Sequence, residues 1–397
     1  PWLRAPATLR ARMGKHVGDF RDSRVTHGWS TRLARTASAV GALLALAASG
    51  CGPSAADGEI VVGAAGPFHE GYGTMTLRGA QLAIDEVNAR GGAGGRRLRL
   101  RPMNDSANGR RAMDVAAAFV EDRGVVAVVG HVNSGAMLMA AQVYDGHLPA
   151  VATAASSPEL TGASAWAFRV ISNDSANALE MARYASQRGY RRAVVLYEND
   201  AYGRGLAALF RRNFSGEVLS SDPIAASDTD LEPFVAYYRK RQPDLVFVAG
   251  TEASGRVVLA EARRQGLRAD FMGGDGWVGV TADTAAAEGA IVAAPFTPTD
   301  PRPGVRDFVA AFRKAHGRDP DAFAALGYDA AMTIARGIQA VGPDREGLRD
   351  ALAALDAAHQ VDGVTGPVAF QGNGDRLGRG IVMTRVRSGA LRVEAGS

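Results

Sequence analysis

Short β-rich apolar runs alternate with helical patterns along this chain, and this alternation restricts its fold more than any other sequence feature. From Glu59 onward such runs occupy residues 60–65, 98–103, 125–130 and 148–153. Between them apolar residues recur at helical spacing, for example within residues 77–89. Strands that alternate with helices lie parallel and are joined by right-handed crossovers. The pattern predicts a doubly wound α/β lobe.

The same alternation restarts after Asn173 and predicts a second lobe. About 347 residues follow residue 50, which is more than one core usually serves. The proline-rich segment 297–303 interrupts the series and indicates a crossing strand or linker. The remaining expected elements are strands at 193–197, 245–250 and 271–274, helices at 202–212, 231–239, 255–264, 305–315, 322–341 and 348–355, and a terminal β pair of 368–370 with 380–386.

The only cysteine, Cys51, closes an apolar run at residues 39–51 that follows Arg32 and Arg35. A membrane-spanning helix needs roughly 20 apolar residues, so this run is typical of a signal-peptide core. The small residues at 48–50 resemble a bacterial lipobox, although Ala48 stands where that motif usually has leucine. The resemblance implies cleavage before a lipidated Cys51, with residues 51–58 as a lipid-anchored flexible tether.

An ordinary secretory signal followed by one unpaired thiol is the alternative. Both interpretations place the protein outside the cytoplasm, at the periplasm or cell surface. A single cysteine cannot form an internal disulfide in either case.

The net charge of +4 comes from the leader alone. The whole chain has 45 Lys and Arg against 41 Asp and Glu, and residues 1–50 hold eight and two of these. The rest therefore carries 37 basic and 39 acidic residues, a net charge of −2. A mildly acidic surface lacks the electrostatic footprint of a nucleic-acid binder.

The sequence contains no standard catalytic signature. It lacks the phosphate loop, the Gly-x-Ser-x-Gly elbow and the His-Glu-x-x-His helix, and its histidines do not pair at metal-ligand spacing. We therefore expect no catalytic residue, no metal and no cofactor.

Polar and aromatic residues gather where the predicted strands end. In open α/β sheets ligands bind at the carboxyl ends of the strands. Serine hydroxyls and free backbone N–H groups at helix starts are receptors for a carboxylate, and an aspartate facing them supplies the opposite pole. Such a layout suits a zwitterion. The segments concerned are 66–73, 130–135, 153–159, 198–203, 251–252 and 274–277.

These segments carry a family resemblance. Residues 59 to about 386 are similar to the periplasmic leucine/isoleucine/valine-type amino-acid-binding proteins that feed ABC importers, through residues 79–88, the Gly130-His131 turn, 154–160 and 202–205. The resemblance implies two α/β lobes joined by three crossings, with ligand trapped in the cleft between them. We expect lobe I at 59–172 plus 300–376 and lobe II at 173–299 plus 377–397, after a leader at 1–50.

The resemblance also implies roles for single residues. Ser134 matches the position whose hydroxyl binds the ligand carboxylate, and Asp275 stands where the family has an acidic residue for the ammonium group. Thr251 replaces a tyrosine that is typical of branched-chain binders. The expected ligand-binding residues are Tyr72, Ser134, Ala154, Ala155, Ser156, Tyr202, Thr251 and Asp275.

Each assignment has a structural alternative. Ser134 could only cap the helix that begins at Gly135. Ser156 and Asp275 could be turn formers, and the two tyrosines could be packing aromatics. Asp174, which follows the first crossing, is expected to cap the next helix rather than to contact ligand.

The sequence thus predicts an extracytoplasmic, lipid-anchored, monomeric solute-binding protein of an ABC importer. Its partners would be a membrane permease and an amino acid or a similar small carboxylate or amide, with no nucleic acid. One alternative is a ligand sensor for a membrane kinase, and another is a secreted hydrolase on a doubly wound fold.

Overall fold

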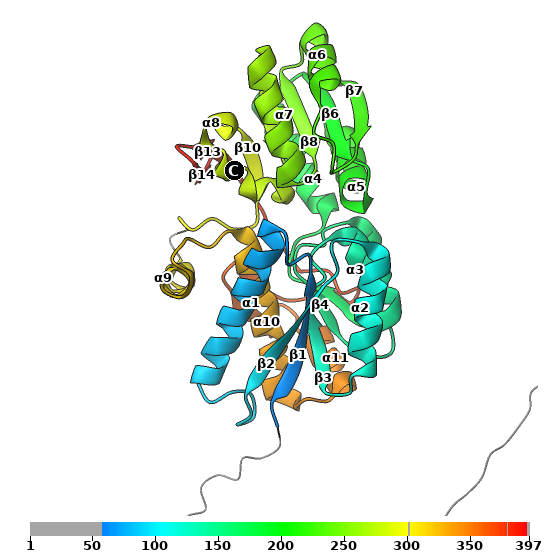
Figure 1. Cartoon of the computed structure of the whole chain (residues 1–397), viewed down its shortest axis with the longest axis vertical. Coiled ribbons are helices and arrows are strands. Elements are labelled where there is room, and N and C mark those ends of the chain that lie inside the picture. The colour runs from blue at the N-terminus through cyan, green and yellow to red at the C-terminus, as the bar shows by residue number, and fades with distance from the viewer. Residues whose placement is uncertain (1–57, 301, 379, 395–397) are drawn as a thin grey trace, which may run out of the picture. The chain divides into compact units, whose positions relative to one another are not determined.

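A computed structural model describes residues 58–300, 302–378 and 380–394 (Figure 1). The predicted leader, Cys51 and most of the tether lie outside the described residues. Within that described part, no helix combines the length and the apolar character needed to cross a membrane.

The first sheet contains five parallel strands in the order β2-β1-β3-β4-β5. Each of the four apolar runs predicted in this half of the chain contributes a strand. The run in β3 is buried at every position, as expected for a parallel strand covered on both faces. The strands are β1 (Ile60–Gly66), β2 (Leu98–Asn104), β3 (Val125–Val129), β4 (Ala150–Ala152) and β5 (Ala167–Arg169).

Helices cover both faces of this sheet (Figure 1). Val129 packs into the cluster that contains α1 and α10, whereas the neighbouring Val128 packs into the cluster with α2 and α3, because side chains alternate along a strand. The helices are α1 (Gly71–Ala89), α2 (Gly109–Glu121), α3 (Ser134–Tyr144), α10 (Ala322–Val341) and α11 (Arg345–Ala353). We call this sheet with its helices lobe I.

Helices α1 and α10 approach each other so closely that only glycine fits at two positions. A Cβ atom on Gly79 would lie 1.9 Å from the carbonyl oxygen of Ala324, and one on Gly327 would lie 2.2 Å from that of Thr76. The two glycines therefore fix α10, which comes late in the chain, against the first helix.

The second sheet contains seven strands in the order β14-β13-β10-β9-β8-β6-β7. The neighbouring strands β7, β6, β8, β9 and β10 are parallel. At the far edge β13 pairs antiparallel with β10, and β14 pairs antiparallel with β13. We call this sheet with α4 to α8 lobe II. Its strands are β6 (Arg192–Glu198), β7 (Glu217–Ile224), β8 (Leu245–Ala249), β9 (Asp270–Gly273), β10 (Ile291–Ala294), β13 (Val382–Arg387) and β14 (Ala390–Val393).

The helices of lobe II confirm the three helical stretches predicted between its strands. They are α4 (Asp174–Gln187), α5 (Ala201–Asn213), α6 (Glu232–Arg241), α7 (Glu252–Gln265) and the short α8 (Thr284–Ala287). A 3-10 helix, η2 (Asp275–Ala282), follows β9, and α9 (Pro303–His316) contacts α1.

The predicted terminal β pair is wrong. Residues 366–368 form β12, which pairs with β11 (Val361–Gly363), whereas β13 pairs with β10 and β14. Only an isolated bridge between Phe370 and Arg376 closes the turn expected at 371–375. Strand β13 extends the sheet of lobe II rather than forming the expected local pair.

The chain passes between the two sheets three times. It leaves lobe I after β5, returns after β10 and leaves again after Arg376 to enter β13. The first and third passages lie together, since a Cβ atom on Gly380 would lie 2.8 Å from Ser172 Oγ. This arrangement confirms the predicted fold class, two doubly wound lobes joined by a three-crossing hinge.

Candidate functional site

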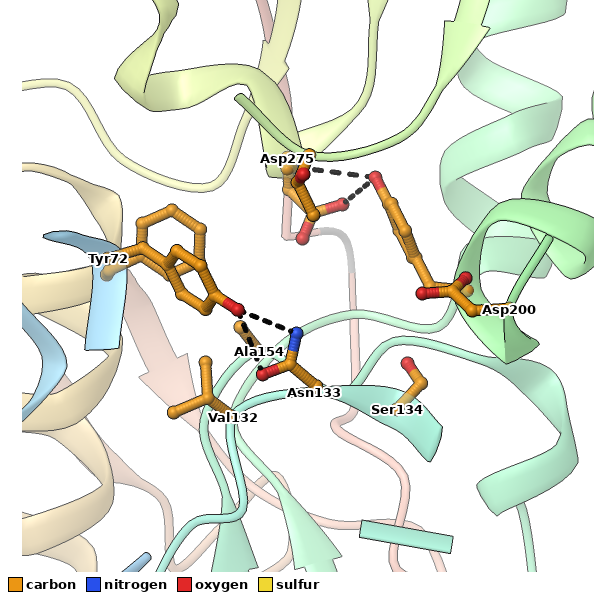
Figure 2. Close-up of a pocket in the computed structure, with 11 residues that line it drawn as sticks. Tyr72, Val132, Asn133, Ser134, Ala154, Asp200 and Asp275 are labelled. Atoms are coloured by element: carbon orange, nitrogen blue, oxygen red, sulfur yellow. Dashed lines mark hydrogen bonds between the residues drawn. The ribbon is translucent and has the colours of Figure 1, made fainter. Parts of the chain in front are cut away.

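A cavity of about 450 Å³, including the space that opens to solvent, lies where strands of both sheets end (Figure 2). Six of the eight predicted residues line it: Tyr72, Ser134, Ala154, Tyr202, Thr251 and Asp275. The other lining residues are Val132, Asn133, Asp200, Gly276 and Phe323. The structure therefore brings together side chains from both lobes.

On the lobe I side, the first turn of α3 faces this cavity. Ser134 is 2% exposed, and its Oγ accepts a hydrogen bond of 3.2 Å from the Ser157 N–H. The helix N-cap is Asn133, whose side chain makes no capping hydrogen bond. The capping role considered for Ser134 is therefore wrong. The first N–H groups of α3 have no intrahelical partner, so they are free to receive an anion.

Ala155 and Ser156 lie behind the cavity rather than on its wall. Ala155 is fully buried in the core beside α3. The Ser156 hydroxyl donates to Asp174 Oδ2 at 3.0 Å, and the Ser156 carbonyl accepts from the Asp174 N–H at 2.9 Å. Among the residues that the structure describes, no hydrogen-bond acceptor faces the buried Ser156 N–H.

On the lobe II side, Asp275 begins η2 directly after β9 and is 5% exposed. The Tyr202 hydroxyl donates to Asp275 Oδ1 at 3.1 Å and accepts from the Gly276 N–H at 3.3 Å (Figure 2). A Cβ atom on Gly274 would lie 2.5 Å from that hydroxyl, so glycine is needed for the approach. Burial raises the pKa of Asp275 to about 6.

Asp174 adds a second buried carboxylate to this region. It is not the N-cap of α4, as predicted, because Asn173 caps the helix by accepting from the Ser175 N–H. Burial, and then the charge of Asp275, raise the pKa of Asp174 to about 8. In the described part of the chain neither Asp174 nor Asp275 has an arginine, lysine or histidine at ion-pair distance. With these pKa values Asp174 is mostly protonated at neutral pH, so the negative charge of the pair lies mainly on Asp275.

An aromatic wall completes the cavity. The rings of Tyr72 and Phe323 lie with centroids 5.3 Å apart at 42°. The Tyr72 hydroxyl and the Asn133 side chain exchange hydrogen bonds of 3.1 and 3.3 Å (Figure 2). Across the cavity, the Thr251 hydroxyl is held by Glu198 Oε1 at 2.7 Å. The wall can contact an apolar side chain of a ligand.

Comparison with known proteins agrees with this geometry. A family model described as periplasmic binding protein matches residues 60–390. The chain belongs to the periplasmic binding protein family. It is 30% identical over 329 residues to the Leu/Ile/Val-binding protein of Citrobacter freundii, covering 80% of this chain and 87% of that protein. The family resemblance predicted from the sequence is confirmed, and the family works outside the cytoplasm.

Two solved structures show the same fold with a ligand. An ABC transporter substrate-binding protein from Desulfitobacterium hafniense in complex with Leu is 30% identical, with a TM-score of 0.73 and coverage of 85% of this chain and 100% of that chain. A branched-chain amino-acid transporter substrate-binding protein from Streptococcus pneumoniae in complex with isoleucine is 25% identical, with a TM-score of 0.80 and coverage of 84% and 98%.

Sequence reasoning missed five lining residues of this periplasmic binding protein. Four of them, Val132, Asn133, Asp200 and Gly276, lie within segments that were singled out at strand ends. Asp200 caps α5 by accepting from the Gly203 N–H at 2.7 Å. Phe323 had no such signal, because it is the second residue of α10 and follows no strand. The described residues contain no group of three His, Cys, Asp or Glu that could hold a metal ion.

Proposed function

We propose that this periplasmic binding protein captures a zwitterionic amino acid between its lobes and presents it to an ABC permease, without catalysing a reaction. The observation that carries the proposal is the charge layout of one cavity. Free N–H donors of α3 and the segment after β4 face one side, and Asp275 supports a negative pole on the other. A carboxylate and an ammonium group buried there would each find partners, which their burial requires.

The proposed ligand contacts are the eight residues predicted from the sequence and Phe323, with Ala155 and Ser156 acting from behind the cavity through backbone groups. Ser134, Ala154, Ala155 and Ser156 would serve the carboxylate side through hydroxyl and backbone groups, and Asp275 with Tyr202 the ammonium group. Tyr72 and Phe323 would contact the side chain. Relatives whose names specify Leu, Ile and Val, and structures bound to Leu and isoleucine, support an apolar amino acid.

The test is a thermal-shift comparison of three probes on the purified protein. L-leucine carries both charged groups, L-leucinamide lacks the carboxylate and 4-methylpentanoate lacks the ammonium group. A ligand at 100 times its dissociation constant adds roughly 2.7 kcal/mol of stability, so L-leucine should raise the melting temperature clearly and the other two much less. Equal shifts for L-leucine and 4-methylpentanoate would refute the ammonium pole.

Closure of the two lobes is a further expectation. L-leucine at saturation should reduce the radius of gyration in solution scattering while the far-ultraviolet circular dichroism stays the same, because rigid lobes rotate about the three passages. Titration with L-leucinamide is the control for non-specific effects. An unchanged radius of gyration with bound L-leucine would contradict the clamp.

We also propose that the protein is a monomer anchored by lipid at Cys51. A diacylglyceryl group plus an amide-linked chain gives stable membrane attachment, where one chain would be marginal. Cys51→Ala should therefore leave an uncleaved precursor that does not partition into the detergent phase. Ser49→Thr, a conservative substitution two residues before the cysteine, is the matched control. Normal cleavage and secretion of Cys51→Ala would contradict the lipoprotein assignment.

A further inference from the structure

Arg169, the last residue of β5, places a guanidinium group in the interior of lobe I, where its side chain is 1% exposed. Its Nη1 donates to the carbonyl oxygens of Ala155 at 3.3 Å and Ser157 at 2.7 Å. Its Nε donates to Asp375 Oδ1 at 2.8 Å, and its Nη2 donates to Asp375 and to Thr161. A guanidinium has five donors in a fixed plane, so this set orients all its partners at once.

These contacts fix the direction of the segment after β4. In a trans peptide the C=O and N–H groups point in opposite directions. Because the Ala155 carbonyl points to Arg169, the Ser156 N–H points away from it, and this is the buried N–H without a partner. The next N–H, of Ser157, donates to Ser134 Oγ, and Ser134 lines the cavity. The segment therefore gives the carbonyls of Ala155 and Ser157 to Arg169 and that of Ser156 to the Asp174 N–H, whereas the Ser157 N–H is turned to Ser134 at the cavity.

Asp375 connects the same guanidinium to the hinge. It lies just before the third passage and is 5% exposed. Its Oδ2 accepts from Thr161 Oγ1 at 2.9 Å and from the Asn173 side chain at 3.0 Å. Asn173 ends the first passage and caps α4 of lobe II. A single carboxylate thus joins two of the three passages to Arg169.

We propose that Arg169 is a positioning residue that couples the hinge, through Asp375, to the backbone donors of the carboxylate subsite. When the passages hold Asp375 in place, Arg169 fixes the peptide groups of residues 155–157, and with them the Ser157 N–H on Ser134, which lines the cavity. This inference rests on the proposed function for its ligand, but the coupling itself concerns the unliganded chain.

The experiment uses the full-length chain with Asp375→Asn, which keeps the shape of the side chain, and Arg169→Lys, which keeps the charge. Hydrogen–deuterium exchange of residues 153–161 in the unliganded protein should become about tenfold faster in both variants, the factor that loss of one net hydrogen bond produces. The affinity for L-leucine should fall about tenfold, whereas that for L-leucinamide should stay the same, because Arg169 acts only on the carboxylate side.

Arg345→Lys is the matched control. Arg345 also donates to several backbone carbonyls, but at the amino end of β3, away from the cavity: those of Phe119, Val120, Asp122 and Val125. This variant should lose stability without changing exchange at 153–161 or the affinity for L-leucine. If Arg345→Lys loses stability but keeps the wild-type exchange and affinity, a general loss of stability does not explain the effects of the Arg169 and Asp375 variants.

Two results would overturn the coupling. One is exchange at 153–161 that stays at the wild-type rate in Asp375→Asn. The other is an equal loss of affinity for L-leucine and L-leucinamide in that variant. If the wild type binds no L-leucine, the proposed amino-acid ligand fails, while the exchange measurement still decides the coupling.

Discussion

Asp275→Asn should weaken the binding of L-leucine by about 1.5–3 kcal/mol, the range for a hydrogen bond to a charged group. The substitution removes the charge of a 5% exposed carboxylate and hardly changes its volume. Isothermal titration calorimetry gives the affinity directly. The unliganded melting temperature should not fall, because the lost charge has no counter-ion in the described structure.

Asp244→Asn is the matched control for this variant. Asp244 accepts from the N–H groups of Arg191 and Arg192 at the opposite end of the lobe II sheet. Its substitution should cost stability and leave the affinity unchanged. If Asp275→Asn binds L-leucine with the wild-type affinity, another residue must contact the ammonium group, and Asp174 is the next residue to substitute.

A double-mutant cycle with Ser134→Ala shows whether the two lobes act on one ligand. Ser134→Ala removes a hydroxyl that faces the carboxylate side, and it should weaken binding by a similar amount. If the lobes must close together on the zwitterion, the two losses should be coupled, whereas independent sites would give simple additivity.

Proton uptake should stabilise the unliganded protein. The pKa of Asp174 rises to about 8 in the fold, from a usual value near 3.8. A carboxyl group with a raised pKa contributes stability that is present at low pH and is lost as the pH rises through the folded value. Between pH 8 and pH 5 the wild type should therefore gain on the order of 4 kcal/mol relative to Asp174→Asn, measured by urea unfolding.

Ligand binding should show the opposite dependence on pH. An ammonium group between the carboxylates favours their charged forms, so L-leucine should bind less tightly below about pH 6, where Asp275 takes up a proton. Binding near pH 7 should release a proton, which calorimetry in two buffers of different ionisation enthalpy measures. Equal observed enthalpies in the two buffers, which mean that no proton is released, would argue against a shared negative pole.

Most of the fold could be predicted from the sequence because the decisive signals are local. Apolar runs and helical spacing placed the helices and four of the five sheet strands of lobe I, missing the three-residue β5, and most elements of lobe II. The missed strand β7 contains Ser220, Ser221, Asp222 and Pro223 and lies at a sheet edge, where neither continuous apolar sequence nor the absence of proline is required. The missed β10 has only four residues.

The site could be predicted only where it follows the strand ends. Six of the eight residues expected at the cavity line it, since the carboxyl ends of parallel strands meet there. Phe323 and the pair of Arg169 with Asp375 could not be found in this way. Each depends on packing between residues that are about 200 or more positions apart. A contact over such a separation leaves no periodic pattern in the local sequence.

The close packing of α1 on α10 has a consequence for the order of events in binding. Tyr72 and Phe323 lie on these two helices, which the glycines allow to pack in close contact. With Ser134 and Ala154 they form a preformed half of the cavity on lobe I alone. An arriving ligand can dock there before lobe II moves. We therefore expect the association rate to depend on lobe I, and the residence time of the ligand to depend on how firmly Asp275 and Tyr202 hold it afterwards.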